Sequence, residues 1–254
     1  MSGSSVIDLS RLPPPDVVER LDYETILGAM RGDLIARAPE LAPVLALESE
    51  LAVKILEVAA YREMLLRARA NDAARAVMLA TSTGADLDHL AALFGVGRFT
   101  LDPGDPEAAP PVAPTHEADG DLRYRAQLAI EGFSVAGPRG AYRSHAFAAS
   151  ALVRDVAVQS PEPGTVLVTI LSGEEPGTAT PALISAVETA LSANDVRPLC
   201  DTVVVQSATI LPYAIEAELE VDQGPDSAVI AEDAFAAVAL HAEKLIYLSD
   251  VAGL

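Results

Sequence analysis

The segment from Leu65 to Arg98, LLRARANDAARAVMLATSTGADLDHLAALFGVGR, decides how the first part of this chain folds. It predicts the end of a long amphipathic helix that stops at Gly84. A short helix from Asp86 to Phe94 follows, with Asp86 as its cap, and stops at Gly95. The segment carries no catalytic pattern. Helices of this kind are typical of parts that dock on other helices, so we expect assembly rather than chemistry.

A longer helical region precedes this segment. Apolar residues at helical spacing predict a first helix from Tyr23 to Arg37. Two prolines then break the chain, and a second, long helix is predicted from Val44 to about Thr81. Asn71 and Asp72 mark the candidate position of a break or bend in it. The apolar stripe expected on this helix consists of Leu47, Leu51, Ile55, Val58 and Leu65.

An extended N-terminal arm is predicted over residues 1–20. Pro13, Pro14 and Pro15 stiffen it. The arm also carries apolar side chains, for which a free tail has little use. Two interpretations remain open, an arm that lies on a neighbouring subunit and a disordered terminus.

Composition divides the chain into a helical part and a mixed part. Residues 21–100 are predicted to form a helical domain. Residues 101–120 are rich in Pro, Ala and acidic residues and cannot pack a core, so they predict a linker. A pair of helices is predicted over residues 121–152.

Strands are predicted only after this helical pair. From Val153 the apolar period changes from about four to two, which predicts two strands, a helix and a strand in a first α+β domain over residues 153–210. Residues 211–254 predict the start of a second α+β domain, with a strand from Tyr213 to Val221 and a helix from about Ser227 to Leu248. This second domain is expected to be incomplete or completed by a partner. The fold class is therefore α+β, with a long N-terminal helical region followed by one or two small strand–strand–helix–strand domains.

Composition and charge exclude several classes of partner. The formal net charge is −20 and the pI is near 4.4, whereas binding to nucleic acid or an anionic membrane requires a basic surface. The single cysteine, Cys200, cannot form a disulfide within the chain, which fits a reducing compartment. No apolar run approaches the roughly 20 residues that span a bilayer. We therefore expect no nucleic acid and no membrane among the partners.

The sequence contains no recognisable catalytic, cofactor or metal pattern. The four histidines have no ligand spacing, and neither HExxH nor CxxC occurs. The run from Ala136 to Gly140 lacks the Walker spacing, and Pro138 removes an N–H that a phosphate loop would use. Cys200 is better interpreted as a small core residue than as a reactive thiol. We expect no cofactor, no metal and no catalytic residue.

The candidate functional residues belong instead to a protein interface. Leu90 and Leu93 are expected to bury against the long helix or against a second copy of the chain. Four arginines stand out in so acidic a chain, Arg67, Arg69, Arg75 and Arg98. They are either solvated or intrahelical pairs, or a basic edge that meets another copy's acidic surface. The interface candidates are Leu51, Ile55, Val58, Leu65, Arg69, Leu90, Leu93 and Arg98.

Four stretches resemble one known family, in collinear order over about residues 60–221. The first is RARANDAARAVMLATSTGADLDHLAALFGVGR, which is similar to a "LA…GADLD.LA..fGV.R" signature of the baseplate J-like family of contractile-tail phages. The second stretch, residues 121–150, resembles that family's helix and its "aGp.gaYr.hA" segment. The third, residues 153–172, resembles its "V.dv.v.sP.PG.V.V.vl" strands. The fourth, residues 191–221, resembles its "VRPltD.V.V" segment.

This resemblance implies a non-enzymatic wedge subunit of a tail baseplate. In that family two copies join a smaller, tail-protein-I-like wedge protein, and six wedges close a ring around the central hub. A lysozyme-like wedge protein is a further implied partner, and the ring couples host contact to sheath contraction. The implied location is the virion tail baseplate, with assembly in the bacterial host cytoplasm. Phage-tail-like injection particles use related proteins.

Two other classes of protein remain as alternatives. A soluble α+β enzyme or ligand-binding protein with a helical oligomerisation arm predicts a concave site with shifted titratable groups. The lack of a dense His, Cys or Gly constellation counts against it. A helical adaptor is disfavoured by the well-formed strands after Val153.

Overall fold

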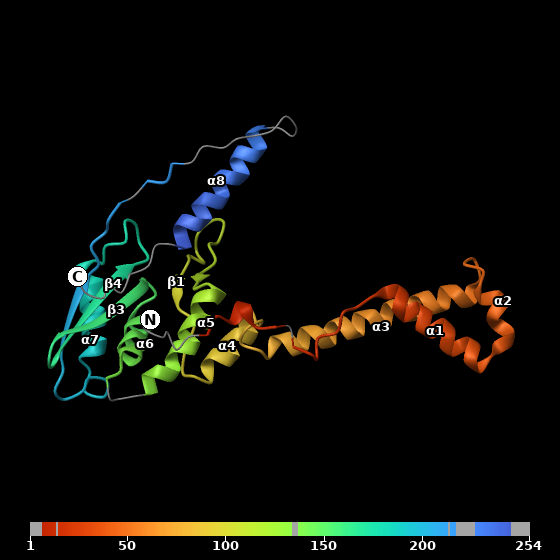
Figure 1. The fold of residues 1–254 in the computed structure, drawn as a ribbon, viewed down its shortest axis with the longest axis horizontal. Helices are drawn as coiled ribbons and strands as arrows, with labels where there is room; N and C mark the ends of the chain where they lie inside the picture. The colour runs from red at the N-terminus through yellow and green to blue at the C-terminus, as the bar shows by residue number, and fades with distance from the viewer. Residues whose placement is uncertain (1–6, 14, 134–136, 213, 217–226, 245–254) are drawn as a thin grey trace. The chain divides into compact units, whose positions relative to one another are not determined.

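Helices form the first third of the chain and a mixed layer of strands and helices follows (Figure 1). The computed structural model describes residues 7–13, 15–133, 137–212, 214–216 and 227–244. These divide into two compact units, residues 7–93 and the residues from Phe94 onward. The predicted α+β class is confirmed. None of the described helices is both long and apolar enough to cross a bilayer.

The unit of residues 7–93 is built from helices alone. Its elements are the 3₁₀ turns η1 (Leu9–Arg11) and η2 (Pro39–Leu41) and the helices α1 (Tyr23–Arg37), α2 (Ala42–Leu45), α3 (Leu51–Ala76) and α4 (Gly84–Ala92). Helix α1 has the predicted bounds, and the Asp22 carboxylate caps it by accepting from the Thr25 N–H at 2.7 Å. It packs on α3 through Ile26, Leu27 and Ala60.

The long helix predicted from Val44 to Thr81 is shorter than expected. The chain turns over residues 46–50, between α2 and α3, so α3 begins at Leu51 and ends at Ala76. The break expected at Asn71 does not occur. The Asn71 side chain is buried because it binds another segment: its Nδ2 donates to the Glu19 carbonyl at 2.8 Å, and its Oδ1 accepts from the Glu19 N–H at 3.0 Å.

This pair of hydrogen bonds ties the end of the predicted N-terminal arm to the chain's own helix. Arg67 adds an ion pair from α3 to the Glu19 carboxylate at 3.1 Å. These contacts hold the chain at Glu19 against α3, and both interpretations of the arm that precedes it stay predictions. Residues 1–6, which include part of the expected apolar arm, lie outside the described residues.

Helix α4 begins two residues earlier than predicted. Thr83 occupies its N-cap and Gly84 is its first residue, so Asp86 lies in the first turn and is not the cap. An acidic residue in the first turn still interacts favourably with the helix dipole.

The second unit contains a small mixed sheet covered by helices. Its elements are β1 (Thr100–Asp102), β2 (Thr115–His116), α5 (Asp119–Leu128), η3 (Ala129–Phe133), α6 (Arg139–Ala149), β3 (Val153–Glu162), β4 (Thr165–Ser172), α7 (Pro181–Leu191), β5 (Thr202–Ser207) and α8 (Ser227–Lys244). The sheet order is β3–β4–β5, with β3 antiparallel and β5 parallel to β4. The predicted strand–strand–helix–strand order is confirmed.

The register of the sheet places its apolar residues on the face that α6 and α7 cover. Val156 pairs with Ile170, and Val166 pairs with Val203. These strands pack on Phe147 of α6 and other helix residues. The tight turn between β3 and β4 requires Gly164, whose φ of 79° is costly for other residues.

The segment predicted as a linker, residues 101–120, is more regular than expected. β1 and β2 pair antiparallel within it, and Asp105 bridges to Val112. Most of its residues are exposed, as its composition predicts, but Glu117 is buried. The strand predicted from Tyr213 to Val221 lies almost entirely outside the described residues, and residues 214–216 carry no strand.

Candidate subunit interface

Helix α3 has two opposite faces, and the described residues of the chain cover only one. At 100° per residue, Val53, Ala60 and Asn71 lie on one side of the helix. All three are buried, and Ala60 packs against α1. This side accounts for the packing of α3 within residues 7–93.

The opposite side of α3 carries an exposed apolar stripe. It contains the predicted interface residues Leu51, Ile55, Val58 and Leu65, whose relative exposures run from 43 to 74%. Leu66 extends the stripe at 69% exposure and was missed, although it is adjacent to Leu65 in the sequence. Full burial of each such side chain contributes about 1.5–3 kcal/mol. The structure therefore brings four predicted residues together on a surface that would gain from a partner.

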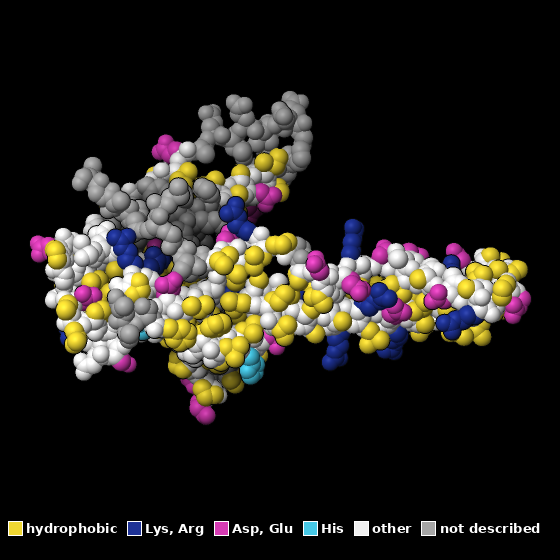
Figure 2. Space-filling model, turned by 60° about the horizontal axis from the view of Figure 1, so that its bottom comes forward, with side chains coloured by type: hydrophobic (Ala, Val, Ile, Leu, Met, Phe, Trp, Pro, Cys, Tyr) yellow, Lys and Arg dark blue, Asp and Glu magenta, His cyan; other side chains and the backbone are white. Residues whose placement is uncertain are grey.

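Arginines lie along the same helix in two different states. Arg67 pairs with Glu63 and Glu19, and Arg75 pairs with Asp72 at 3.2 Å. Arg69, an interface candidate, and Arg62 are exposed, and within the described part of the chain neither is in an ion pair. Figure 2 shows Lys and Arg side chains among the hydrophobic ones along the α1–α3 part of the surface.

Helix α4 buries different residues from those predicted. Leu87 and Ala91 are fully buried, whereas Leu90 is half-buried. Leu93 is 77% exposed, so its predicted burial does not occur within its own chain. Burial of Leu93 against a second copy stays a prediction.

Arg98, the last interface candidate, is held inside the second unit. Its guanidinium donates to the Glu117 carbonyl at 2.6 Å and pairs with the Asp119 carboxylate at 2.7 Å. Its side chain is 14% exposed. These bonds join the glycine-rich end of the first motif to the start of α5. Arg98 therefore has a structural role within its own chain, and its role in an interface stays a prediction.

A second arginine reinforces this junction. Arg125 of α5 pairs with the buried carboxylate of Glu117 and donates to the Gly97 carbonyl at 3.2 Å. Its guanidinium lies 3.8 Å from the centre of the Phe99 ring, a cation–π contact. Glu117 also accepts from the Phe99 N–H at 3.1 Å. Because a buried charge needs both a partner and hydrogen bonds, Glu117 and Arg125 depend on each other.

The later motifs are joined to one another in the same way. The Tyr142 hydroxyl donates to the Asp201 carboxylate at 2.6 Å, which ties α6 to the segment before β5. Burial and this carboxylate raise the pKa of Tyr142 above its usual range. Gly137, with φ of 73°, leaves room for Pro198, because a Cβ at residue 137 would lie 3.0 Å from the proline ring. Two motifs that are far apart in the sequence therefore form one junction.

Arg143 makes a further junction between motifs. It donates to the Tyr124 hydroxyl of α5 at 3.0 Å and to the Asp155 carboxylate of β3 at 3.2 Å. Sequence reasoning identified the stretches that contain these residues but not their pairing, because a pairing between distant residues has no local signal.

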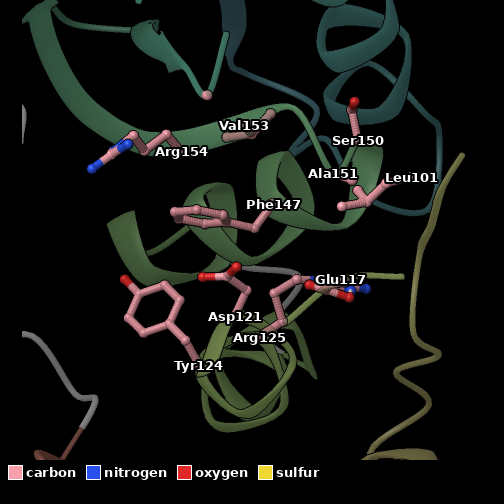
Figure 3. Close-up of a pocket in the computed structure, with 11 residues that line it drawn as sticks. Leu101, Glu117, Asp121, Tyr124, Arg125, Phe147, Ser150, Ala151, Val153 and Arg154 are labelled. Atoms are coloured by element: carbon pink, nitrogen blue, oxygen red, sulfur yellow. The ribbon is translucent and has the colours of Figure 1, made fainter. Parts of the chain in front are cut away.

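A cavity of about 360 Å³ lies between α5, α6 and β3 (Figure 3). Asp121 and Tyr124 of α5 lie on one side of it, beside the ring of Phe147 from α6. Partial burial and the nearby Glu117 raise the pKa of Asp121. Glu117 and Arg125, which also line the cavity, are already bound to each other. A concave site with a shifted carboxyl is what the enzyme alternative predicts. The pairing of Glu117 with Arg125, however, gives these two lining residues a role in the junction itself.

A metal site is not formed by the described residues. Among them, no group of three or more His, Cys, Asp or Glu side chains is arranged to hold an ion. The exposed stripe on α3 is therefore the feature whose function the chain itself leaves unexplained.

Comparison with known proteins gives consistent matches along the chain. The family model of the baseplate J-like N-terminal domain matches residues 48–105, and that of the baseplate J-like central domain matches residues 134–207. A similar protein is baseplate protein J of Escherichia phage P2, which is 47% identical over 227 residues. The alignment covers 87% of this chain and 75% of the relative. Both exposed faces considered above, on α3 and α4, lie in the first matched region.

Proposed function

The chain belongs to the baseplate J-like family, and from this premise we propose that it is a structural wedge subunit of a contractile-tail baseplate. In this role it forms part of a ring around the central hub and couples host contact to sheath contraction. It acts in the virion tail, as the name of its phage P2 relative indicates for that protein. The proposal treats it as a structural protein without catalytic function.

The exposed stripe on α3 is the observation that supports an assembly role. Burying its large aliphatic side chains against other chains would remove apolar surface from water and so stabilise the complex. Contacts that are weak singly become strong when they are repeated round a closed ring. The proposed partners are a second copy of the chain, a smaller tail-protein-I-like wedge protein and a lysozyme-like wedge protein.

A ring of this kind also suits a trigger. In a ring with two states, all the equivalent interfaces change together. A contact at the edge of the ring can therefore shift the equilibrium of the whole ring between the two states. The second unit would supply a rigid body for this movement, because its motifs are joined by Arg98, Arg125 and Arg143.

Localising the chain in tail particles tests this proposal. The chain would be expressed with the proteins encoded beside it, and purified particles would be examined by electron cryomicroscopy. We expect density for the chain in a six-fold ring at the distal end of the tail. Its absence from purified tails, or a position along the tube or sheath, would contradict the proposal.

A further inference from the structure

An exposed tip, residues 197–200, lies at one end of the β3–β4–β5 sheet. The Asp201 N–H donates to the Pro198 carbonyl at 3.2 Å, which closes a tight turn over Leu199 and Cys200. Leu199 has a relative exposure of 100%. Cys200 is exposed as well, so its interpretation as a core residue is wrong. The large aliphatic side chain of Leu199 therefore contributes nothing to the packing of the described part of the chain.

The tip is held in place by the sheet and by α6. The Tyr142 hydroxyl of α6 binds the carboxylate of Asp201, which directly follows the tip. The Thr202 N–H then donates to the Gly164 carbonyl at 2.7 Å and joins the tip to β5. A segment that is already ordered loses little conformational entropy when it binds a partner. The tip is therefore a preformed apolar projection.

Arg197 gives the tip a positive charge. It is exposed, and within the described part of the chain no carboxylate forms an ion pair with it. The nearby carboxylates act on other groups. Asp201 binds Tyr142, and Asp195 opposes the effect of burial on the pKa of His145. The tip thus presents a cation and a leucine that the chain itself does not use.

The cavity of about 360 Å³ between α5, α6 and β3 offers complementary groups (Figure 3). Leu101, Phe147 and Val153 form an apolar part of its lining. Asp121 also lines it, and among the described residues its carboxylate is in no hydrogen bond or ion pair. A cavity of about 150 Å³ with apolar walls already holds a benzene molecule. The cavity is therefore large enough for a leucine side chain together with part of an arginine.

The other charged residues of the cavity leave Asp121 as its available carboxylate. Glu117 and Arg125 are bound to each other. Arg154 lowers the pKa of Asp121 but forms no ion pair with it, and its side chain extends away from Asp121 in Figure 3. Partial burial and Glu117 outweigh this effect and raise the pKa of Asp121. A further cation beside Asp121 would therefore be stabilising.

The tip and the cavity lie at opposite ends of the same sheet. Thr202, at the tip end, pairs with Thr165 at the start of β4, whereas Val153, in the cavity lining, pairs with Ser172 at the end of β4. The length of β4 separates these ends by roughly 23 Å, at about 3.3 Å per residue. A chain cannot place its tip in its own cavity. A contact between copies would be head to tail, and such contacts close into rings when the rotation between subunits permits.

We propose that the tip of one copy inserts into the cavity between α5, α6 and β3 of a second copy. Leu199 contacts the apolar lining, and Arg197 pairs with Asp121. The apolar contact supplies affinity, and the charge pair fixes the orientation. This inference rests on the proposed function, because a head-to-tail contact of this kind joins equivalent subunits round a ring.

Cysteine crosslinking of the full chain tests this contact, because Cys200 is the single cysteine of the sequence and is part of the tip. Ala151→Cys adds a second cysteine in the lining of the cavity. The two cysteines cannot bridge within one chain, since a disulfide requires Cα atoms within about 7 Å of each other. We expect oxidation of the concentrated protein with copper–phenanthroline to give a ladder of dimers, trimers and longer oligomers on a non-reducing gel.

Matched variants show whether the ladder comes from the proposed contact. Ala186→Cys, at an exposed position on α7, should give no ladder. In the Ala151→Cys chain, Leu199→Ser should reduce the crosslinked oligomer at least about tenfold, as expected for a central apolar contact. Leu211→Ser changes another exposed leucine outside the tip and should leave the ladder unchanged.

Exchange of the two charges tests the pairing itself. In the Ala151→Cys chain, Arg197→Asp and Asp121→Arg should each reduce the ladder, because like charges then meet in the contact. The chain that carries both changes should recover the ladder, because every contact again pairs opposite charges. Circular dichroism checks that each variant folds.

Three results would overturn the inference. These are the absence of a ladder from the folded Ala151→Cys chain, an equal ladder from Ala186→Cys, and a ladder that Leu199→Ser leaves unchanged. All three are measured on the purified chain and do not bear on whether the chain is present in tail particles. The proposed function is tested separately, by locating the chain in those particles.

Discussion

Single residues in the family motifs bind residues of other segments of the chain. Arg98 binds Asp119, Arg125 binds Glu117, and Tyr142 binds Asp201. Each pair connects segments that are separated along the chain. These contacts give the paired residues a role in the stability of the second unit.

The hydroxyl of Tyr142 should contribute measurably to stability. Tyr142→Phe removes its hydrogen bond to the Asp201 carboxylate, and such bonds contribute about 1.5–3 kcal/mol. We expect the free energy of unfolding in urea to fall by about that amount. Tyr61→Phe, at an exposed position on α3, is the matched control and should change little. An unchanged Tyr142→Phe midpoint would contradict the junction described above.

His145 should make stability depend on pH. Burial lowers its pKa below 6.5, partly opposed by Asp195 and the Gly132 carbonyl. The unfolded chain therefore binds more protons than the folded chain between the lowered pKa and 6.5, so stability rises with pH across that window and is lost as pH falls through it. Denaturant unfolding at several pH values should show a flatter profile for His145→Gln. A slope identical to that of the wild type would rule this contribution out.

At the scale of elements, α3 is both a scaffold and a surface. One side of it binds α1 and the segment at Glu19, and the other side carries the exposed stripe. The sequence predicted the stripe because heptad-like spacing is a local pattern. It did not predict which side its own chain covers, because that depends on α1 and on Asn71, which are distant in the sequence.

The bounds of helices and strands were predicted correctly where they depend on neighbouring residues, and not where they depend on residues distant in the sequence. α1 has its predicted bounds, since capping residues and apolar periods are local. The long helix was predicted too long, because no strong breaker marks residues 46–50. The charged junctions at Arg98, Arg125 and Arg143 could not be predicted, because each joins residues of different elements.

Asn71 should hold the chain near Glu19 against α3. Asn71→Ala removes both hydrogen bonds to the Glu19 backbone. We expect faster hydrogen exchange at the Glu19 amide, measured by mass spectrometry or NMR. Asp72→Ala, an exposed neighbour on the same helix, should leave that rate unchanged. Equal rates in Asn71→Ala and wild type would show that Asn71 is not the anchor.

Helix α4 offers a test that separates folding from assembly. Leu87 is fully buried, so Leu87→Asp should destabilise the chain. Leu93 is mostly exposed, so Leu93→Asp should leave the monomer folded but prevent ring formation. Thermal unfolding and particle yield distinguish the two effects. Normal ring formation by Leu93→Asp would remove this residue from the interface.

The molecule consists of two units. The helical unit carries the exposed apolar stripe on α3, and in the second unit the ion pairs of Arg98 and Arg125 join separate segments of the chain. A chain of net charge −20 stays soluble at high concentration before it assembles. In the proposed assembly, the apolar side chains of the α3 stripe supply the affinity for a partner. This arrangement suits a subunit that has to be made in many copies and added to a closed ring.

Incorporation of an Ile55→Asp variant into tail particles tests the central claim most directly. Wild type, Ile55→Asp and the control Ile130→Asp would each be expressed with the neighbouring tail proteins. Ile130 is exposed to a similar extent but lies outside α3 and the N-terminal arm. Quantitative mass spectrometry would then measure the chain in purified particles. The claim predicts that Ile55→Asp folds normally but is absent from particles, while Ile130→Asp is present as in wild type. Incorporation of Ile55→Asp at the wild-type level would contradict it.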